Sequence, residues 1–367
     1  MRPLDTTPGP EQPTPAPLIA VDRAIAELRR GGAVAVLAED GRVLHALAAE
    51  AVTPETLAQL AAGAGSAPRL AVTGRRARVL GLAAEDAGVS LLDRDLSAEC
   101  VATLADPCLS GPHPQLGDLK AVSAEGPTVQ AVTLAKLARL LPAVVVAEAK
   151  AVLSSQVAVA AADIAAYQIN AARTLRVVSQ ARVPLSEAEN ARIVAFRPAD
   201  GGIEHLAIVI GEPDVDQPVL TRLHSECFTG DLLGSLRCDC GDQLKGAIAE
   251  IAQGGSGVLL YLAQEGRGIG LVNKLRAYQL QDDGFDTLDA NLQLGFDDDE
   301  RIYQPAAQML RLLGIGAVRL LTNNPAKVGQ LAAHGIQVAE RVPHVFPAND
   351  HNKSYLRTKA TRGGHLF

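Results

Sequence analysis

The sequence has no tryptophan and only two methionines, and aromatic residues make up 3% of its 367 residues. It also lacks an excess of positive charge, since the formal net charge at pH 7 is -7 with histidine neutral. Non-specific binding to nucleic acid depends on clustered Lys and Arg that neutralise phosphates, so this charge argues against a nucleic-acid partner. No apolar run approaches the length of a membrane span. We therefore expect a cytoplasmic protein with no nucleic-acid partner and no membrane segment.

Cysteine is also scarce, and the five cysteines are odd in number, which does not suit a disulfide framework. Three of them lie among acids, arginines and a histidine, a setting that suits a metal in a reducing compartment. Cys100 and Cys108 have no such partners at useful spacing, so we interpret them as isolated reduced thiols. Residues 1–18 are rich in proline and threonine and lack an apolar core, which predicts a flexible tail and not a signal peptide.

Hydrophobic residues make up 48% of the chain and charged residues 20%, which is typical of a globular protein. A chain of this length is too long for one ordinary domain and suits two, each with its own core. Helical and alternating apolar patterns are mixed, so the fold class is α/β or α+β. We place the domain boundary near Ala172, in a helix expected over 157–175, and predict domains at 19–172 and 173–367.

Three cysteines mark the most informative stretch, residues 222–243, which reads RLHSECFTGDLLGSLRCDCGDQ. Thiolate is the ligand that zinc prefers, and three protein ligands leave a fourth position for water, as in catalytic zinc sites. Cys227, Cys238 and Cys240 therefore predict a catalytic site with one zinc ion per chain. Two alternatives stay open: His224 could complete a structural zinc site, or the cysteines could be reduced thiols without a metal.

Two junctions between a strand and a helix have features that suit an anion. The buried strand expected over 257–263 ends in the turn QEGRGIG, whose backbone N–H groups would face the positive end of a helix. The strand expected over 317–322 leads to NNPAK, with Asn324 as N-cap and Pro325 at the first helical position. Lys327 opposes the helix dipole there, and a bound anion would explain it. A tight turn without a ligand remains the alternative for the first junction.

Further polar residues lie on the helix expected over 271–280 and in the run DDDER at 297–301. Cations on a helix surface are most simply explained as solvated side chains. Acids that precede a helix are adequately explained by capping and by the helix macrodipole. Neither pattern indicates a functional site when it is considered alone.

Four motifs in the second half resemble GTP cyclohydrolase II, the zinc enzyme that opens riboflavin synthesis: RLHSEC, SLRCDCGxQ, QEGRGIGL and LTNNPxK. The resemblance covers about 175–367, and the motifs occur in the family order. It implies attack of a zinc-activated water at C8 of GTP and release of formate. Separate loss of diphosphate would give the diaminopyrimidine nucleotide monophosphate. Mg²⁺ is expected to accompany the GTP phosphates.

The same resemblance implies roles for single residues. Tyr278 matches a tyrosine used in ring opening, Asp299 the proposed general base, and Arg301 the proposed nucleophile toward the α-phosphate. Because the pKa of Arg exceeds about 12, stabilisation of charge in the transition state is an equally good interpretation of Arg301. The residues expected to contact GTP are Arg222, Leu223, His224, Ser225, Glu226, Gln243, Glu265, Gly266, Arg267, Thr287, Thr322 and Lys327.

The first half, over about 20–150, more weakly resembles dihydroxybutanone phosphate synthase. That family has an acid-rich magnesium-binding loop and a GHTEA motif, where this chain has AEDGRVLHAL and GPTVQA. Magnesium needs hard oxygen ligands, and Glu39 and Asp40 alone are a poor substitute, so we expect no synthase site. The domain would then be a scaffold or have no role. Since the resembling synthase is a dimer, we expect a homodimer.

Two other classes of function stay open. The chain could be a paralogue that acts on another purine or stops at a partly hydrolysed product. It could also be a non-catalytic binding module that zinc stabilises. The presence of Tyr278 argues against the first alternative, and the retention of Asp299 and Arg301 as well argues against the second.

Overall fold

The computed structural model describes residues 15–82, 88–93, 96–109 and 119–347, with scattered positions between 350 and 366. Most of the tail predicted for residues 1–18 lies outside this part. Residues 15–18, which the sequence analysis placed in that tail, instead form the first turn of helix α1 (Pro15–Arg29), where Leu18 is buried. The C-terminal segment that resembles the family tail also lies largely outside the described residues.

The chain divides into two compact units, and one of them is discontinuous. The first, here called the N-terminal unit, consists of Thr14–Tyr167 together with Gly268–Glu300. The second, here called the cysteine unit, contains Gln168–Arg267 and the chain from Arg301 onward. The contiguous boundary at 172/173 stays a prediction. The division in the structure is of another kind, because a later segment belongs to the same unit as the first half.

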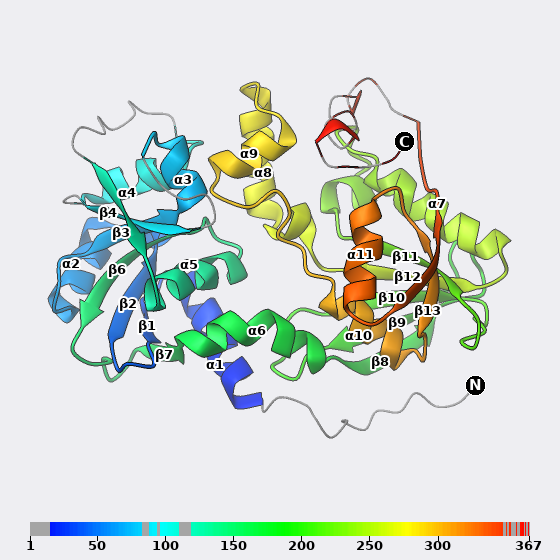
Figure 1. Ribbon diagram of the computed structural model, residues 1–367, viewed down its shortest axis with the longest axis horizontal. Helices are drawn as coiled ribbons and strands as arrows, with labels where there is room; N and C mark the ends of the chain where they lie inside the picture. The colour runs from blue at the N-terminus through cyan, green and yellow to red at the C-terminus, as the bar shows by residue number, and fades with distance from the viewer. Residues whose placement is uncertain are drawn as a thin grey trace. The chain divides into compact units, whose positions relative to one another are not determined.

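A seven-stranded sheet forms the centre of the N-terminal unit, with the strand order β5-β4-β3-β6-β2-β1-β7 (Figure 1). Neighbouring strands are antiparallel except for β1 and β7, which are parallel. The bounds are β1 (Val34–Leu37), β2 (Val43–Ala48), β3 (Arg69–Thr73), β4 (Val89–Asp93), β5 (Lys120–Ala124), β6 (Ala143–Ala149) and β7 (Val157–Ala160).

Alternating side chains give this sheet two apolar faces. On β6, Val144 and Val146 belong to one buried cluster with α1 and α5 (Pro127–Leu137), whereas Val145 belongs to another with α2, α3 and α4. Because successive side chains of a strand point to opposite faces, such a wholly apolar strand can serve both layers. The helices of the second layer are α2 (Pro54–Gly63), α3 (Gly74–Val79) and α4 (Ala98–Ala105), and a short 3-10 turn, Ala49–Ala51, follows β2.

The later segment of the N-terminal unit contributes helices α8 (Leu271–Asp282) and α9 (Thr287–Gln293), drawn in yellow in Figure 1. A separate buried cluster holds it, in which Leu141 from the first half packs with Ile269, Leu280 and Phe296 from the segment. Helix α9 lies against α3. The segment is therefore part of this unit's core and not a surface loop.

A second seven-stranded sheet lies at the centre of the cysteine unit, with the order β14-β13-β11-β12-β10-β9-β8. Strands β8, β9, β10 and β12 are joined in antiparallel pairs, and β12, β11, β13 and β14 in parallel pairs. The sheet is therefore mixed. The bounds are β8 (Arg176–Arg182), β9 (Ala191–Arg197), β10 (His205–Ile210), β11 (Val219–Ser225), β12 (Gly257–Leu262), β13 (Ala317–Leu321) and β14 (Gln337–Val342).

Helices cover both faces of this sheet. Helix α7 (Cys240–Gln253) packs on one face through Ala247, Ile248 and Ile251. Helices α10 (Gln304–Leu312) and α11 (Pro325–Ala333) share the other buried cluster, which contains Val258 and Leu260 of the central strand β12. The α/β or α+β fold class predicted from the sequence is confirmed, since each unit combines a seven-stranded sheet with helices.

One local prediction needs correction, and one stretch that carried no prediction contains regular structure. The helix expected over 157–175 begins later, as α6 (Ala161–Arg173), because Val157–Ala160 instead pairs with β1 as strand β7. The stretch between Ser90 and Gly126, whose pattern is weak, contains β4, α4 and β5. Within the described residues, no helix combines the length and apolar character needed to cross a lipid bilayer.

Candidate active site

The predicted site residues of the cysteine unit gather where three parallel strands end. β11, β12 and β13 run in the same direction, and the chain leaves them toward Glu226, Ala263 and Thr322, respectively. The carboxyl ends of parallel strands lie at one edge of a sheet, which is where open α/β sheets commonly bind ligands. Residues far apart in the sequence therefore converge on this edge.

Three thiols form a cluster just beyond β11. The ligand atoms of Cys227, Cys238 and Cys240 lie within 4.8 Å of one another, and the sulfurs of Cys227 and Cys238 are 3.7 Å apart. Cys227 precedes a single π-turn, Phe228–Leu232, and Cys240 is the first residue of α7. The sequence prediction that these three cysteines come together is confirmed, and they form a group that can hold a metal ion.

Glycine at position 230 makes room for the sulfurs. A Cβ atom there would lie 2.8 Å from the sulfur of Cys238 and 3.0 Å from that of Cys227, closer than side chains pack. A Cβ at Gly241 would lie 2.5 Å from the carbonyl oxygen of Gly230. Gly230 and Gly241 therefore leave the space that the chain needs to fold around the thiols.

Cys227 disfavours ionisation of the two other thiols. The hydrogen bond with Cys227 raises the pKa of Cys238 to about 11, and a hydrogen bond with Cys227 likewise raises the pKa of Cys240. Three thiolates this close repel unless a cation compensates them. Since thiolates are the ligands of thiophilic divalent metals, the donor set fits such an ion.

Asp231 organises the residues beside the cluster. Its carboxylate accepts from the backbone N–H of Cys227 at 3.0 Å and from the hydroxyl of Tyr261 at 2.9 Å, and it lies 3.0 Å from Nε2 of His224. Burial lowers the pKa of His224 below its ordinary value. His224 is thus engaged with Asp231 and lies outside the group of three metal-ligand candidates. No pattern in the sequence singles out Asp231 and Tyr261, apart from the presence of an acid four residues after Cys227.

Arg222, on the same strand as His224, is buried. Its Nη1 donates to the carbonyl oxygen of Leu321 at 2.9 Å, and its Nη2 donates to Oε1 of Gln243. The amide nitrogen of Gln243 donates in turn to Asp239, so this chain of polar groups ties β11 to α7. Burial lowers the pKa of Arg222 to about 10, which keeps it charged at neutral pH. In the described part of the protein, its buried Nε has no hydrogen-bond partner.

The turn after β12 bends back to the thiol loop. Glu265 is buried and accepts from the backbone N–H of Phe228 at 2.6 Å and from that of Gly266 at 2.9 Å. Gly266 and Arg267 both have positive φ, 64° and 62°, which is costly for a residue with a side chain. Held strain of this kind is typical of functional sites. Glu265 therefore joins the glycine-rich turn to the thiol cluster.

The junction after β13 has the predicted cap. Asn324 accepts from the backbone N–H of Ala326 as N-cap of α11, and Pro325 follows at the first helical position, as predicted. Oγ1 of Thr322 accepts from the backbone N–H of Asn324 at 3.0 Å. Lys327 is buried, and its Nζ donates to the carbonyl oxygen of Leu223 at 2.9 Å. The anion predicted at this junction stays a prediction.

Two more predicted residues meet at the end of β11. Arg301, where the chain re-enters the cysteine unit, directs Nη1 to Oγ of Ser225 at 3.5 Å. The backbone N–H of Glu226 donates to the carbonyl oxygen of Leu262 at 2.8 Å, which extends the β11 and β12 pairing to the edge of the site. Arg301 and Ser225 are thus brought together although they lie far apart in the sequence.

Three predicted residues lie in the other unit. Tyr278 is on α8, with Nζ of Lys274 5.6 Å from the centre of its ring. Thr287 is the first residue of α9, which Asp286 caps by accepting from two backbone N–H groups. Asp299 lies near the end of the inserted segment. Their roles toward a substrate stay predictions.

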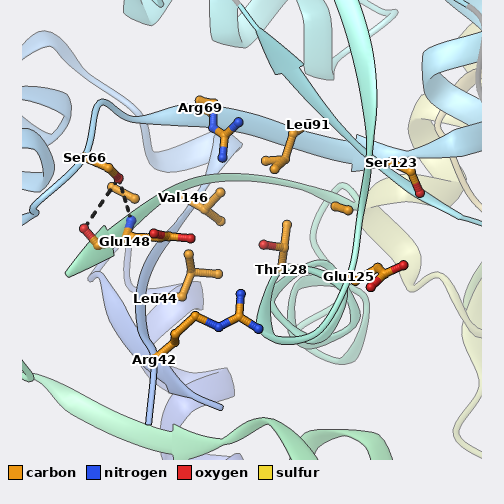
Figure 2. Close-up of a pocket in the computed structure, with 12 residues that line it drawn as sticks. Arg42, Leu44, Ser66, Arg69, Leu91, Ser123, Glu125, Thr128, Val146 and Glu148 are labelled. Carbon is orange, nitrogen blue, oxygen red and sulfur yellow. Dashed lines mark hydrogen bonds between the residues drawn. The ribbon is translucent and has the colours of Figure 1, made fainter. Parts of the chain in front are cut away.

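The N-terminal unit has a pocket of its own, of about 190 Å³, over strands β2, β3, β5 and β6 (Figure 2). Arg42 and Arg69 point into it, and its two carboxylates, Glu125 and Glu148, lie on opposite sides. Within the described ranges, the three cysteines are the only group of three or more Cys, His, Asp or Glu residues with closely spaced ligand atoms. This pocket therefore has no such group among the residues described.

Comparisons with known proteins agree with these features. A family model described as GTP cyclohydrolase II matches residues 175–343. The chain is 57% identical to the GTP cyclohydrolase-2 of Azospirillum brasilense over 382 aligned positions, which cover 100% of this chain and 99% of that protein. It is 39% identical to the GTP cyclohydrolase-2 of Xylella fastidiosa, over 95% of this chain and 87% of that one. The chain belongs to the GTP cyclohydrolase II family, an enzyme family of riboflavin biosynthesis.

Other similar proteins match parts of the chain or match it weakly. The GTP cyclohydrolase-2 of Pseudomonas paraeruginosa is 57% identical over 47% of this chain and 84% of its own length. Among solved structures, a two-domain 3,4-dihydroxy-2-butanone 4-phosphate synthase of A. baumannii is similar with a TM-score of 0.32 and 19% identity. That likeness covers 82% of this chain and 93% of the other. A score this low does not by itself establish a common fold.

Substitution of Gly230, which lies against the sulfurs, gives a direct test of the thiol cluster. Gly230→Ala would force a Cβ against two sulfurs, so we expect most of the metal bound by the protein to be lost and the free energy of unfolding to fall by about 1–3 kcal/mol. Metal content and thermal unfolding measure both effects. Gly329→Ala in α11 is the matched control, because a Cβ there meets nothing within 4 Å. Full metal content in Gly230→Ala would contradict this account of the cluster.

Proposed function

We propose that this protein hydrolyses GTP to the diaminopyrimidine nucleotide monophosphate, formate and diphosphate, as the first step of riboflavin biosynthesis. The observation that carries the proposal is the cluster of three thiols at the carboxyl edge of β11, beside buried polar residues on β11, α7 and α11. Membership of the family supports the same reaction.

Zinc is the metal proposed for Cys227, Cys238 and Cys240, one ion per chain. Three thiolate donors suit zinc, and three protein ligands leave a coordination position for water. When bound, zinc acidifies water and so supplies a nucleophile at neutral pH for attack on the purine ring. The engagement of His224 with Asp231 supports this open site over a closed one that would use His224 as the fourth ligand.

The chain's own residues bind and orient the nucleotide in this proposal. The residues proposed to contact GTP from the cysteine unit are Arg222, Leu223, His224, Ser225, Glu226, Gln243, Glu265, Gly266, Arg267, Thr322 and Lys327, and Thr287 is proposed from the N-terminal unit. The buried cations Arg222 and Lys327 offer positive charge that suits phosphates. The backbone held by Glu265 offers N–H groups beside the thiols.

Three residues are proposed to take part in the chemistry. Tyr278 polarises or protonates the purine during ring opening, and Asp299 acts as the general base. Arg301 stabilises negative charge in the transition state at the α-phosphate, because a guanidinium remains protonated and is a poor nucleophile. Its contact with Ser225 fixes it at the end of β11. The prediction of Mg²⁺ with the phosphates rests on the resemblance alone.

The N-terminal unit is proposed to make no dihydroxybutanone phosphate. Asp40 is exposed and forms an ion pair with Arg42. The backbone N–H of Arg42, and then its guanidinium, lower the pKa of Asp40 by hydrogen bonding to it, so this acid is already engaged. The pocket in Figure 2 presents its carboxylates from opposite sides. We further propose a homodimer in the cytoplasm with no nucleic-acid or membrane partner, as the charge of the chain and the resemblance of its first half suggest.

The first experiment incubates the pure protein with GTP and zinc and assays formate and diphosphate separately. We expect both products from the parent protein. Cys238→Ser should abolish formate release and lower the zinc content, because a hydroxyl is a poor zinc ligand. Cys100→Ser, outside the cluster, is the control. A fully loaded and fully active Cys238→Ser protein would exclude the metal assignment.

The role of Tyr278 is tested by removing its hydroxyl. Tyr278→Phe should keep most of the affinity for GTP and slow formate release by about 10²- to 10⁴-fold, the range typical of a positioned acid or base. Diphosphate release provides an internal comparison in the same samples. If formate release by Tyr278→Phe equals that of the parent, the role assigned to Tyr278 is wrong.

The absence of synthase activity is tested with ribulose 5-phosphate and magnesium. We expect the intact protein to form no four-carbon product, because Glu39 and Asp40 alone are a poor substitute for an acid-rich magnesium loop and, among the described residues, only the three cysteines form a group of three or more closely spaced ligands. A dihydroxybutanone phosphate synthase assayed in parallel serves as the positive control. Detection of the four-carbon product would refute the proposal for this unit.

A further inference from the structure

We infer that the first half of the chain contains positioning residues for GTP hydrolysis, because it fixes the inserted segment Gly268–Glu300 that carries Tyr278, Thr287 and Asp299. The inference rests on the proposed function for what these three residues do. The positioning residues and the segment all belong to the N-terminal unit. These residues contact the segment at its N-terminal end near Gly270 (the entry), along α8, and toward its C-terminal end near Gly295 (the exit).

At the entry, the segment lies directly against the turn after α5. A Cβ at Gly270 would lie 3.0 Å from that of Arg139, so the two backbones approach closely. Arg139 itself has a positive φ of 58°, and its carbonyl oxygen accepts from Nδ2 of Asn273 at 3.0 Å. The same amide donates to the carbonyl oxygen of Ile269. The start of α8 is thereby fixed to the first half of the chain.

Along α8, one arginine bridges to two acids of the first half. Nη2 of Arg276 lies 2.9 Å from a carboxylate oxygen of Glu50, and its Nε lies 3.0 Å from one of Asp106. Glu50 also accepts from the backbone N–H of Leu141 at 2.6 Å, so the acid is itself held in place. Arg276 is two residues before Tyr278 on the same helix. Its contacts therefore set both the position and the rotation of α8.

At the exit, buried donors hold the backbone of the segment. Oγ1 of Thr73 donates to the carbonyl oxygen of Gly295 at 2.7 Å, and Nη1 of Arg76 donates to that of Gln293 at 2.8 Å. Arg76 also donates to the carbonyl oxygen of Leu104 at 2.9 Å. A Cβ at Gly295 would lie 2.8 Å from Oγ1 of Thr73, so no other residue fits there without displacement.

Two cations then hold the acids on either side of Asp299. Nε of Arg75 lies 2.6 Å from a carboxylate oxygen of Asp297, and Nζ of Lys136 lies 2.6 Å from one of Glu300 and 3.7 Å from Asp297. The Glu300 carboxylate also accepts from the backbone N–H of Asp297. The proposed general base thus lies in a short loop whose flanking residues are tied to the first half.

These ion pairs matter more for geometry than for stability. The side chains of Arg75 and Asp297 are 27% and 48% exposed, and pairs that are open to water contribute little to the free energy of folding. A shift of about 1 Å in a catalytic group can nevertheless cost about 10²-fold in rate. Loss of the pairs should therefore slow the reaction more than it destabilises the protein.

The test uses the full-length, zinc-loaded protein with Arg75→Met and Lys136→Met combined. Methionine keeps the apolar stem of each side chain and removes its charge. We expect kcat for formate release to fall about 10- to 100-fold, with a smaller change in KM, unchanged zinc content and faster amide exchange at 294–300. Lys136→Arg alone should behave like the parent, because it retains a cation at the same place.

Arg30→Met is the matched control, because it removes an exposed ion pair of the same unit, with Glu27, that does not touch the segment. Parent-like kcat in the double variant would overturn the inference. If the double variant does not fold, Lys136→Met alone is measured and judged by the same outcomes. If the parent itself releases no formate, the proposed function fails, and amide exchange at 294–300 alone decides whether these residues hold the segment.

Discussion

The close approach of three sulfur atoms is the constraint on which the rest of the cysteine unit depends. Their ligand atoms lie within 4.8 Å of one another, and Cys227 raises the pKa of both Cys238 and Cys240. To bring them together, the chain needs a glycine at 230, a π-turn after Cys227 and a helix that begins at Cys240. Asp231 then fixes the loop to His224 and Tyr261, and Glu265 attaches the next turn. The thiol loop therefore determines the positions of the residues around it at this edge of the sheet.

Local chemistry made part of this site predictable from the sequence. The preference of zinc for thiolate ligands predicts that the three cysteines come together, and they do. The residue preferences of helix N-termini predict Asn324 as the cap and Pro325 after it, and both are found there. The buried partners of these residues could not be predicted in the same way. Asp231, Tyr261 and Asp239 act through contacts that exist only once separate strands and helices have packed, and a single acid or tyrosine in a sequence carries no mark of such a contact.

The division into units shows the same limit on a larger scale. Periodic patterns correctly indicated mixed helices and strands in both halves, but they describe only neighbours in the sequence. That Gly268–Glu300 folds with the first half depends on Thr73, Arg76 and Leu141, which meet the segment across more than a hundred residues of chain. Glycines at 270 and 295 mark these close approaches. In the sequence they are indistinguishable from glycines of ordinary turns.

The discontinuity of the N-terminal unit also has a consequence for biosynthesis on the ribosome. Its seven-stranded sheet is complete when β7 has been translated, yet the helices α8 and α9 that finish its core follow only after β8–β12 of the other unit. Domains generally fold in order from the N-terminus during synthesis. Both apolar layers of this early sheet consist of residues from the first half, whereas Leu141 stays uncovered until most of the second sheet has been produced. The last cluster of the N-terminal unit consequently forms late, and a single cut in the gene between the first half and the rest would leave Leu141 exposed.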